Sequence, residues 1–210
     1  VAIEPSVLQR ALREGTDRSF NMITIDGDTS TNDMVAVLAN GLAGNDTIDS
    51  ETHPLYEPFR QALEKMMIHL GKLIVSDGEG SSKFAEYEVT GAADEEKARK
   101  LVRSISSSAL VKTAMFGRDP NWGRILCAGG NAGVPFDYER VDLELGTEED
   151  LVCLLKQGVP QSFDRKHMKQ LLRESHLKVH LKMHEGDGRA VGWGSDLTTD
   201  YVLFNSVYTT

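Results

Sequence analysis

Apolar residues recur about every three or four positions in several stretches of the chain, the spacing that places them on one face of an α-helix. The longest such stretch covers residues 54–75. Proline or serine precedes some of these stretches and glycine follows, as expected where helices begin and end. The pattern predicts helices over 4–14, ended by Gly15; from a cap at Ser30 to Gly41 or Gly44; over 54–75 and 94–105; from Pro120 to the paired glycines 129–130; and over 164–174.

Shorter stretches alternate between apolar and polar positions or are rich in β-branched and aromatic residues, which is typical of strands. The mixture of helices, strands and hairpins predicts an α/β or α+β sandwich. A soft boundary near 135–140 would divide it into residues 1–136 and 137–210. The predicted strands are 19–26, 84–90, 109–116, 141–145 paired with 151–155, and 177–183 joined to 188–196 by an Glu-Gly-Asp-Gly turn.

The chain is acidic and long enough for one large or two small domains. Its 210 residues carry a formal net charge of −9, which disfavours nucleic acid and anionic membranes as partners and suits a cationic substrate. No apolar run approaches the length needed to span a bilayer. Cys127 and Cys153 lie far apart without CxxC spacing, so we expect reduced, buried thiols of a cytoplasmic protein rather than a disulfide or a metal site.

An Asp-x-Asp loop follows the predicted strand 19–26. In haloacid-dehalogenase-type phosphatases the first aspartate of such a motif attacks phosphorus and the second acts as acid and base. Asp26 and Asp28 would take these roles in a Mg²⁺-dependent phosphohydrolase. That mechanism needs a further acidic pair after a later strand, and the sequence offers no convincing one. A polar loop that caps the next helix is favoured, with the phosphohydrolase as the alternative function.

Glu79 stands between two glycines in the loop Gly78–Lys83. The loop does not match the phosphate-binding consensus, and it follows a predicted helix rather than a strand. Glycine permits positive φ angles and close approach of the backbone, so a carboxylate held here could meet an ammonium group. Spacing alone favours a solvated surface turn over this binding role.

His176, His180 and His184 recur every four residues, which would suit a metal site on a helix. Their neighbours alternate between apolar and polar residues, so the stretch predicts a strand, in which His180 and His184 lie roughly 13 Å apart. We therefore expect solvent-facing histidines that share no metal ion. The residues considered so far supply no obvious nucleophile, so a non-enzymatic amino-acid-binding module also stays open.

Four longer stretches together resemble the β chain of the ornithine acetyltransferase family, the bifunctional glutamate N-acetyltransferases of cyclic arginine biosynthesis. They are SFNMITIDGDTSTND, VSDGEGSSKF, GRDPNWGRI and WGSDLTTDYVLFNSVYTT. They follow in the family's order over nearly the whole chain. The sequence departs from the family at SSK, where Ala-Thr-Lys is more usual, at MFGRDP, where Gly-Asn-Asp-Pro is more usual, and in a longer segment 45–60.

The resemblance implies a precursor that cuts itself before an internal threonine and keeps both fragments, commonly as an α₂β₂ assembly. It implies a fold like that of N-terminal-nucleophile hydrolases, a sandwich of sheets between helices completed by the partner α chain. The new N-terminal threonine would take the acetyl group from N²-acetylornithine and pass it to glutamate in a ping-pong cycle. This threonine is expected upstream of Val1 and the oxyanion donors on the α chain, so no catalytic residue is expected here.

By the same resemblance, Glu79, Asn205 and Thr210 bind substrate, Glu79 through a cationic amine of ornithine and the others through an amino-acid head group. The apolar tail after Asp200 is expected to pack into the body and hold the last two in place. No metal or cofactor is implied, although acetyl-CoA stays open as a second acetyl donor. Structural or supporting roles are expected for Asp26, Asp28, Asn32, Asn121 and Trp122.

Overall fold

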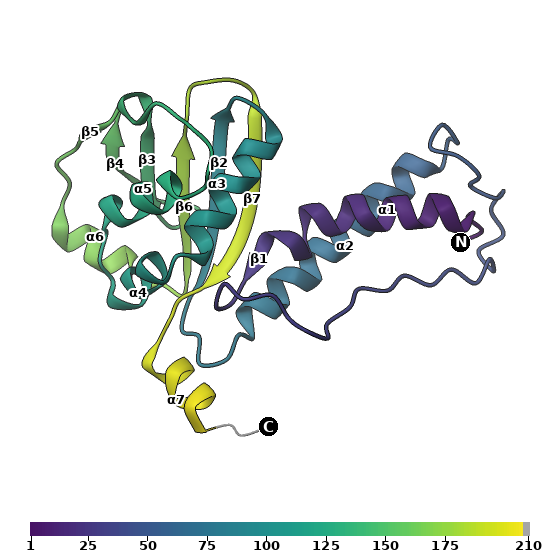
Figure 1. The fold of residues 1–210 in the computed structure, drawn as a ribbon, viewed down its shortest axis with the longest axis horizontal. Helices are drawn as coiled ribbons and strands as arrows, with labels where there is room; N and C mark the ends of the chain where they lie inside the picture. The colour runs from purple at the N-terminus through teal and green to yellow at the C-terminus, as the bar shows by residue number, and fades with distance from the viewer. Residues whose placement is uncertain (208–210) are drawn as a thin grey trace. The chain divides into compact units, whose positions relative to one another are not determined.

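The computed structural model describes residues 1–207 and divides the chain into two compact units (Figure 1). The first unit joins Val1–Asn21 with Thr29–Leu73, and the second joins Met22–Asp28 with the chain from Ile74 onward. The predicted boundary near residue 137 falls inside the second unit, where strands from both sides of it belong to one sheet.

Two long helices form the first unit. α1 (Pro5–Arg18) and α2 (Tyr56–Ser76) confirm the helices predicted over 4–14 and 54–75, although Gly15 does not end α1. A Cβ at Gly15 would lie 2.7 Å from Met67 Sδ, so the glycine lets α1 approach α2 closely. One buried cluster of this unit consists of Val7, Ala11, Ile48 and Tyr56.

The segment between these helices is largely irregular, and the helix predicted after Ser30 is wrong. The Ser30 hydroxyl accepts a hydrogen bond from Asp33 N at 3.2 Å, as a helix cap would, but residues 34–40 form no helix. Met34 and Leu38 are 87% and 92% exposed. A short helix depends on packing of its apolar face, so the capping contact alone does not stabilise one.

A seven-stranded mixed sheet runs through the described part of the second unit, in the order β1-β7-β2-β6-β3-β4-β5. Most of the predicted strands are confirmed, and 141–145 pairs antiparallel with 151–155 as expected. The strand predicted over 19–26 shrinks to two residues after a 3₁₀ turn. The strands are β1 (Ile23–Thr24), β2 (Phe84–Ala92), β3 (Asp142–Gly146), β4 (Leu151–Lys156), β5 (Val159–Pro160), β6 (His176–Lys182) and β7 (Gly188–Ser195).

The predicted hairpin of the last two strands is wrong, because β2 lies between them. β2 pairs in parallel with β6 and antiparallel with β7. The Glu-Gly-Asp-Gly turn therefore crosses over an intervening strand instead of closing a two-stranded hairpin. Sequence-adjacent strands often pair, but here a strand from nearly one hundred residues earlier occupies the central position.

Helices cover the apolar face of this sheet. α3 (Glu95–Ser107) packs on β2 and β7, and α4 (Ala109–Gly117) and α5 (Trp122–Gly130) adjoin it (Figure 1). α3, α5 and the short α6 (Arg165–Leu171) confirm predicted helices, whereas α4 replaces the predicted strand 109–116. The Ser108 hydroxyl accepts from Val111 N at 3.4 Å and caps α4. The apolar positions buried in α4 are helically spaced: Val111, Ala114 and Met115.

The opposite face of the sheet is polar and carries several ion pairs. Lys178 Nζ lies 3.2 Å from Glu88 Oε2 and 2.7 Å from Glu148 Oε2. His180, predicted to face solvent, is only 15% exposed; it hydrogen-bonds the Thr90 hydroxyl at 2.9 Å, and burial lowers its pKa. Among the described residues no group of three His, Cys, Asp or Glu side chains could hold a metal ion.

The two thiols are free, but they are not buried as predicted: Cys127 is exposed and Cys153 half-buried. Across residues 1–207, no helix combines the length and apolar character needed to cross a bilayer.

Candidate functional site

The candidate site lies at one end of the sheet, entirely within the second unit. Three segments meet there: residues 25–28 after β1, the loop 77–83 before β2, and α7 (Thr199–Val207) after β7 (Figure 1). Strand ends that converge on one edge of a sheet bring together loops that are distant in sequence. The polar side chains of these three segments therefore form a single cluster.

Glu79 is exposed at the tip of its loop, and the glycines on either side of it have close neighbours. A Cβ at Gly78 would lie 3.0 Å from Ile25 Cδ1. Gly80 has a φ of +62°, and a Cβ there would lie 2.6 Å from Tyr201 N. At Gly80 the loop backbone therefore lies directly against the first turn of α7.

Asn205 contacts Glu79, although 126 residues separate them. Its amide nitrogen donates to Glu79 Oε2 at 3.1 Å and to Tyr201 O, one turn back in α7, at 3.0 Å. Two of the three residues predicted to bind substrate are thus adjacent. The third, Thr210, lies outside the described residues.

Asp26 is held by hydrogen bonds rather than presented as a free nucleophile. Its Oδ2 accepts from the Tyr201 hydroxyl at 2.8 Å, and its Oδ1 accepts from Asp28 N at 2.8 Å. Burial, the hydrogen bond to Asp26 and the nearby carboxylates of Asp26, Asp28 and Glu79 raise the pKa of Tyr201 to about 12. Tyr201 therefore stays protonated at neutral pH and donates to Asp26. This arrangement fits a structural loop carboxylate and gives the phosphohydrolase alternative no support.

Comparison with known proteins identifies the chain over its whole length, because residues 1–210 match the ArgJ family. The chain belongs to the ArgJ family. It is 50% identical over its full length to an "Arginine biosynthesis bifunctional protein ArgJ" of Symbiobacterium thermophilum, and 46% identical over 99% of its length to one of Bacillus licheniformis. The chain spans about half the length of these relatives, 51% and 50% respectively.

A solved ArgJ structure has the same fold. The crystal structure of "Arginine biosynthesis bifunctional protein argJ" from Bacillus halodurans matches with a TM-score of 0.93 and 42% identity. The match covers 99% of this chain and 96% of that chain. The predicted family and the predicted mixed α/β fold, with helices flanking a sheet, are confirmed.

A buried lysine that the sequence did not single out is connected through Ser195 to the segment that carries Asp26 in this ArgJ-family chain. Lys112 of α4 is 1% exposed and donates hydrogen bonds to the backbone oxygen and the hydroxyl of Ser195. The Ser195 hydroxyl in turn donates to Ile25 O at 3.2 Å, next to Asp26. Burial lowers the pKa of Lys112 to about 8, while the carboxylates of Asp196 and Asp26 act in the opposite direction.

The other residues named from the family resemblance belong to other segments of the chain. Asn121 caps α5: its Oδ1 accepts from Arg124 N at 3.1 Å and its Nδ2 donates to Asp119. Trp122 is the first residue of that helix, and Asn32 belongs to the first unit, beside Ser30. The geometry of Asn121 agrees with the structural role expected for it.

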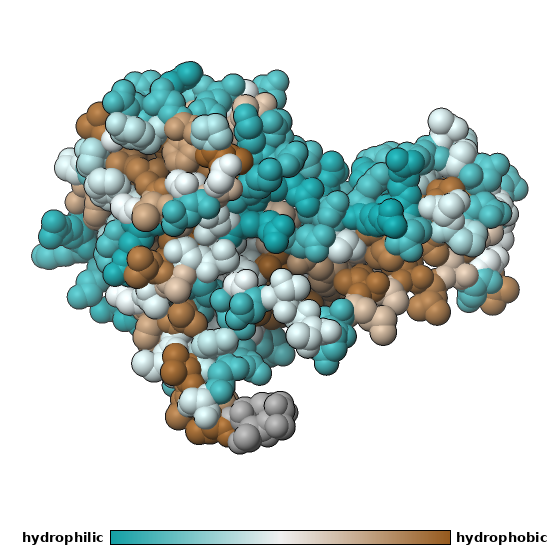
Figure 2. All heavy atoms as spheres, viewed as in Figure 1, coloured by the Kyte–Doolittle hydropathy of each residue, from teal (hydrophilic) through white to brown (hydrophobic). Residues whose placement is uncertain are grey.

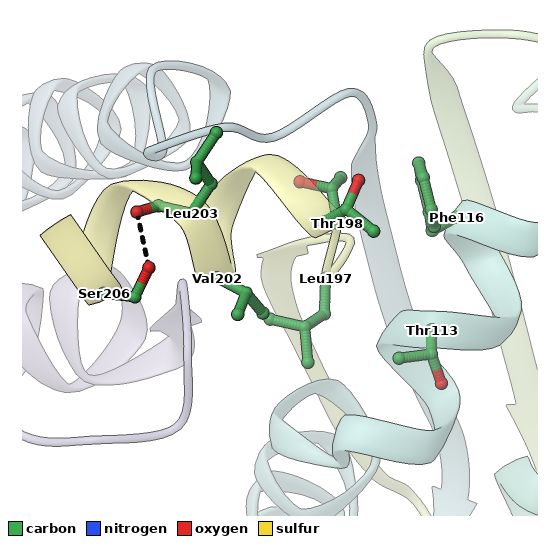
Figure 3. A pocket seen from close by; sticks show the side chains of 8 residues that line it. Thr113, Phe116, Leu197, Thr198, Val202, Leu203 and Ser206 are labelled. Atoms are coloured by element: carbon green, nitrogen blue, oxygen red, sulfur yellow. Dashed lines mark hydrogen bonds between the residues drawn. The ribbon is translucent and has the colours of Figure 1, made fainter.

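As far as residue 207, where the described structure ends, the tail does not pack into the body of this chain as predicted. α7 buries none of its residues, and Val202, Leu203, Phe204 and Val207 are 56–68% exposed. Figure 2 shows apolar side chains gathered on the surface over α7. Between α7 and α4 lies a cavity of about 500 Å³ with a largely apolar lining (Figure 3). Thr113 and Phe116 line it on α4, and Val202, Leu203 and Ser206 line it on α7.

The sequence contains a signal for α7 that apolar spacing does not show. Thr198 precedes the apolar run and Asp200 lies in the first turn of α7, the arrangement of a capped helix start. Asp196 and Tyr201 were missed as well. No local pattern marks them, since their partners are more than a hundred residues away.

Proposed function

We propose that this chain is the β half of an ornithine acetyltransferase that moves the acetyl group of N²-acetylornithine to glutamate in arginine biosynthesis. The observation that carries the proposal is the direct contact between Glu79 and Asn205. Both residues were assigned to the substrate from separate segments of the family resemblance. Membership of the ArgJ family supports the same reaction.

In this proposal the reaction divides into two half-reactions. A threonine hydroxyl attacks the acetyl carbonyl of N²-acetylornithine, the amide C–N bond breaks, and the departing amine takes the proton, which leaves an acetyl ester and free ornithine. The amine of glutamate then attacks the ester carbonyl, and the threonine hydroxyl recovers its proton. Oxyanion donors stabilise the charge that develops on the carbonyl oxygen in each step.

The residues of this chain would bind and orient the donor. The exposed Glu79 carboxylate is a suitable partner for the δ-ammonium of acetylornithine, and the Asn205 amide fixes that carboxylate from one side. Asp26 and Asp28 add negative charge nearby, since both raise the pKa of Tyr201 together with Glu79. An anionic cluster favours a cationic amino acid over a neutral one.

The threonine nucleophile would come from sequence that precedes Val1. The oxyanion donors would come from a partner α chain. Relatives about twice as long as this chain support such a precursor, and the Bacillus halodurans chain, matched over 96% of its length, supports a separate chain of this extent. We extend the proposal to self-cleavage and an α₂β₂ assembly in the cytoplasm. An acetyl-threonine mechanism needs no cofactor, and acetyl-CoA would serve only as an additional acetyl donor.

The test uses the full-length protein that contains this chain. Intact-mass analysis should show two chains. The mass of the second chain should correspond to a chain with an N-terminal threonine. Purified protein should then form N-acetylglutamate from N²-acetylornithine and glutamate, detected by mass spectrometry, and Glu79→Gln should weaken this transfer. Glu149→Gln, which changes an exposed glutamate on the turn before β4, is the matched control. A single uncut chain without acetyl transfer would refute the proposal.

A further inference from the structure

One buried hydroxyl joins the loop that carries Glu79 to the helix that carries Asn205. Thr198 is 5% exposed and immediately precedes α7. Its Oγ1 donates to Gly80 O at 2.6 Å and accepts from Tyr201 N at 3.1 Å. The same oxygen therefore caps the first turn of α7 and fixes the residue next to Glu79.

The loop lies close against the first turn of α7 at this junction. Gly80 adopts a left-handed conformation, and a Cβ there would lie 2.6 Å from Tyr201 N and 2.8 Å from the carbonyl carbon of Asp200. Backbone meets backbone without intervening side chains. The Thr198 hydroxyl is the hydrogen-bonding group that sets the register of this contact.

The far end of the loop is anchored independently. Asp196 is 3% exposed, and its Oδ1 accepts from Ser82 N at 2.8 Å and Lys83 N at 3.0 Å. Its Oδ2 accepts from the Ser82 hydroxyl at 2.5 Å. Because Asp196 fixes residues 82 and 83, loss of the Thr198 contact would free mainly the part of the loop around Glu79.

We propose that Thr198 is a positioning residue, which holds Glu79 and Asn205 in the relative placement that recognises the side-chain ammonium of the acetyl donor. This inference rests on the proposed function, because it takes Glu79 as the group that binds the ammonium. Thr198 itself touches neither the donor nor the reacting atoms. It acts through the backbone of Gly80 and through the first turn of α7.

The experiment compares two acetyl donors with the full-length enzyme. N²-acetylornithine carries the δ-ammonium, and N-acetylnorvaline has the same carbon chain without it. Thr198→Val keeps the size of the side chain but removes the hydroxyl, whereas Thr198→Ser keeps the hydroxyl. We expect Thr198→Val to reduce the preference for N²-acetylornithine roughly tenfold, mainly through a higher KM for this donor, with a much smaller change in kcat/KM for N-acetylnorvaline. Thr198→Ser should retain the wild-type preference.

Three further variants separate positioning from general damage. Thr199→Val makes the same chemical change one residue later, at an exposed position, and should behave as wild type. Glu79→Gln should lose the same preference as Thr198→Val. The double variant should lose no more than either single variant, because both act on one interaction. Thr198→Ala replaces Thr198→Val if the valine variant does not fold.

The outcomes distinguish a failure of the proposed function from a failure of the positioning role of Thr198. Wild-type enzyme that transfers acetyl from neither compound refutes the proposed function itself. Wild-type transfer with a preference that Thr198→Val leaves intact overturns the positioning role alone, as does an equal loss with both donors. Failure of both hydroxyl-free variants to fold would also overturn it, because the hydroxyl would then serve the fold rather than the site.

Discussion

Replacing Lys112 with methionine should make the stability of the protein less dependent on pH above neutrality. Burial lowers the pKa of Lys112 from 10.5 to about 8. At about 1.4 kcal/mol per pKa unit, keeping this lysine charged in the folded state costs roughly 3 kcal/mol relative to the unfolded state. The side chain is 1% exposed, so solvent screening does not remove this cost.

The direction of the effect follows from proton binding. Below about pH 8 the lysine is charged in both states, and the whole cost is present. Between about pH 8 and 10.5 the folded protein has released the proton while the unfolded chain still holds it, so stability rises with pH. Between about pH 7.5 and 9.5 the wild-type protein should gain roughly 2 kcal/mol of unfolding free energy relative to Lys112→Met.

Urea denaturation of the full-length protein at both pH values measures this difference. The comparison between wild type and variant cancels the titration of all other groups, provided that each curve has the same slope. Lys166→Met, at an exposed position of α6, controls for the loss of a surface lysine and should show no such gain. An equal stability difference between wild type and Lys112→Met at both pH values would show that Lys112 is not desolvated in the folded protein.

Three other substitutions test separate features of the second unit. Gly192→Ala should destabilise the protein by about 1–3 kcal/mol in urea denaturation, because a Cβ there would lie 2.6 Å from both Met22 O and Val102 Cγ1; a neutral effect would show that α3 can move away from β7. For Tyr201→Phe, the rise of absorbance at 295 nm with pH should match that of the wild type up to about pH 11, since the Tyr201 phenol has a pKa of about 12. A smaller rise than in the wild type near pH 10 would contradict the raised pKa. Asp196→Ala should make the bond after Lys83 cleavable by trypsin, because three hydrogen bonds to the loop disappear, and intact-mass analysis after limited proteolysis detects the cut; resistance equal to wild type would show that the loop is held by other contacts.

Sequence periodicity predicted the elements whose apolar residues repeat regularly over several helical turns or along paired strands. The helix over 54–75 and the strand pair 141–145 and 151–155 are of this kind. The segment 109–116 is too short for periodicity to separate a helix from a buried strand, and the cap at Ser108 decides for a helix. The helix predicted after Ser30 is wrong for the opposite reason. Its capping hydrogen bond exists, but its apolar residues Met34 and Leu38 are exposed.

The candidate site depended on information that no local pattern contains. Spacing alone left Glu79 as a surface turn, and only the family resemblance singled it out. The hydrogen bonds from Asn205 to Glu79 and from Tyr201 to Asp26 join positions 126 and 175 residues apart. Such contacts follow from the strand order, in which β7 delivers α7 to the end of the sheet beside the loop that leads into β2.

The position of β2 also has a consequence for how the chain folds. β2 pairs with β6 and β7, so Ala85 meets Leu177 on one side and Gly194 on the other. During synthesis both edges of β2 stay unpaired until β6 and β7 have left the ribosome. Closing such long loops before any pairing is gained makes folding slow and exposes the strand to aggregation. Folding of the second unit is therefore expected to follow synthesis of β7, and a truncation before β6 should give insoluble protein rather than a smaller stable domain.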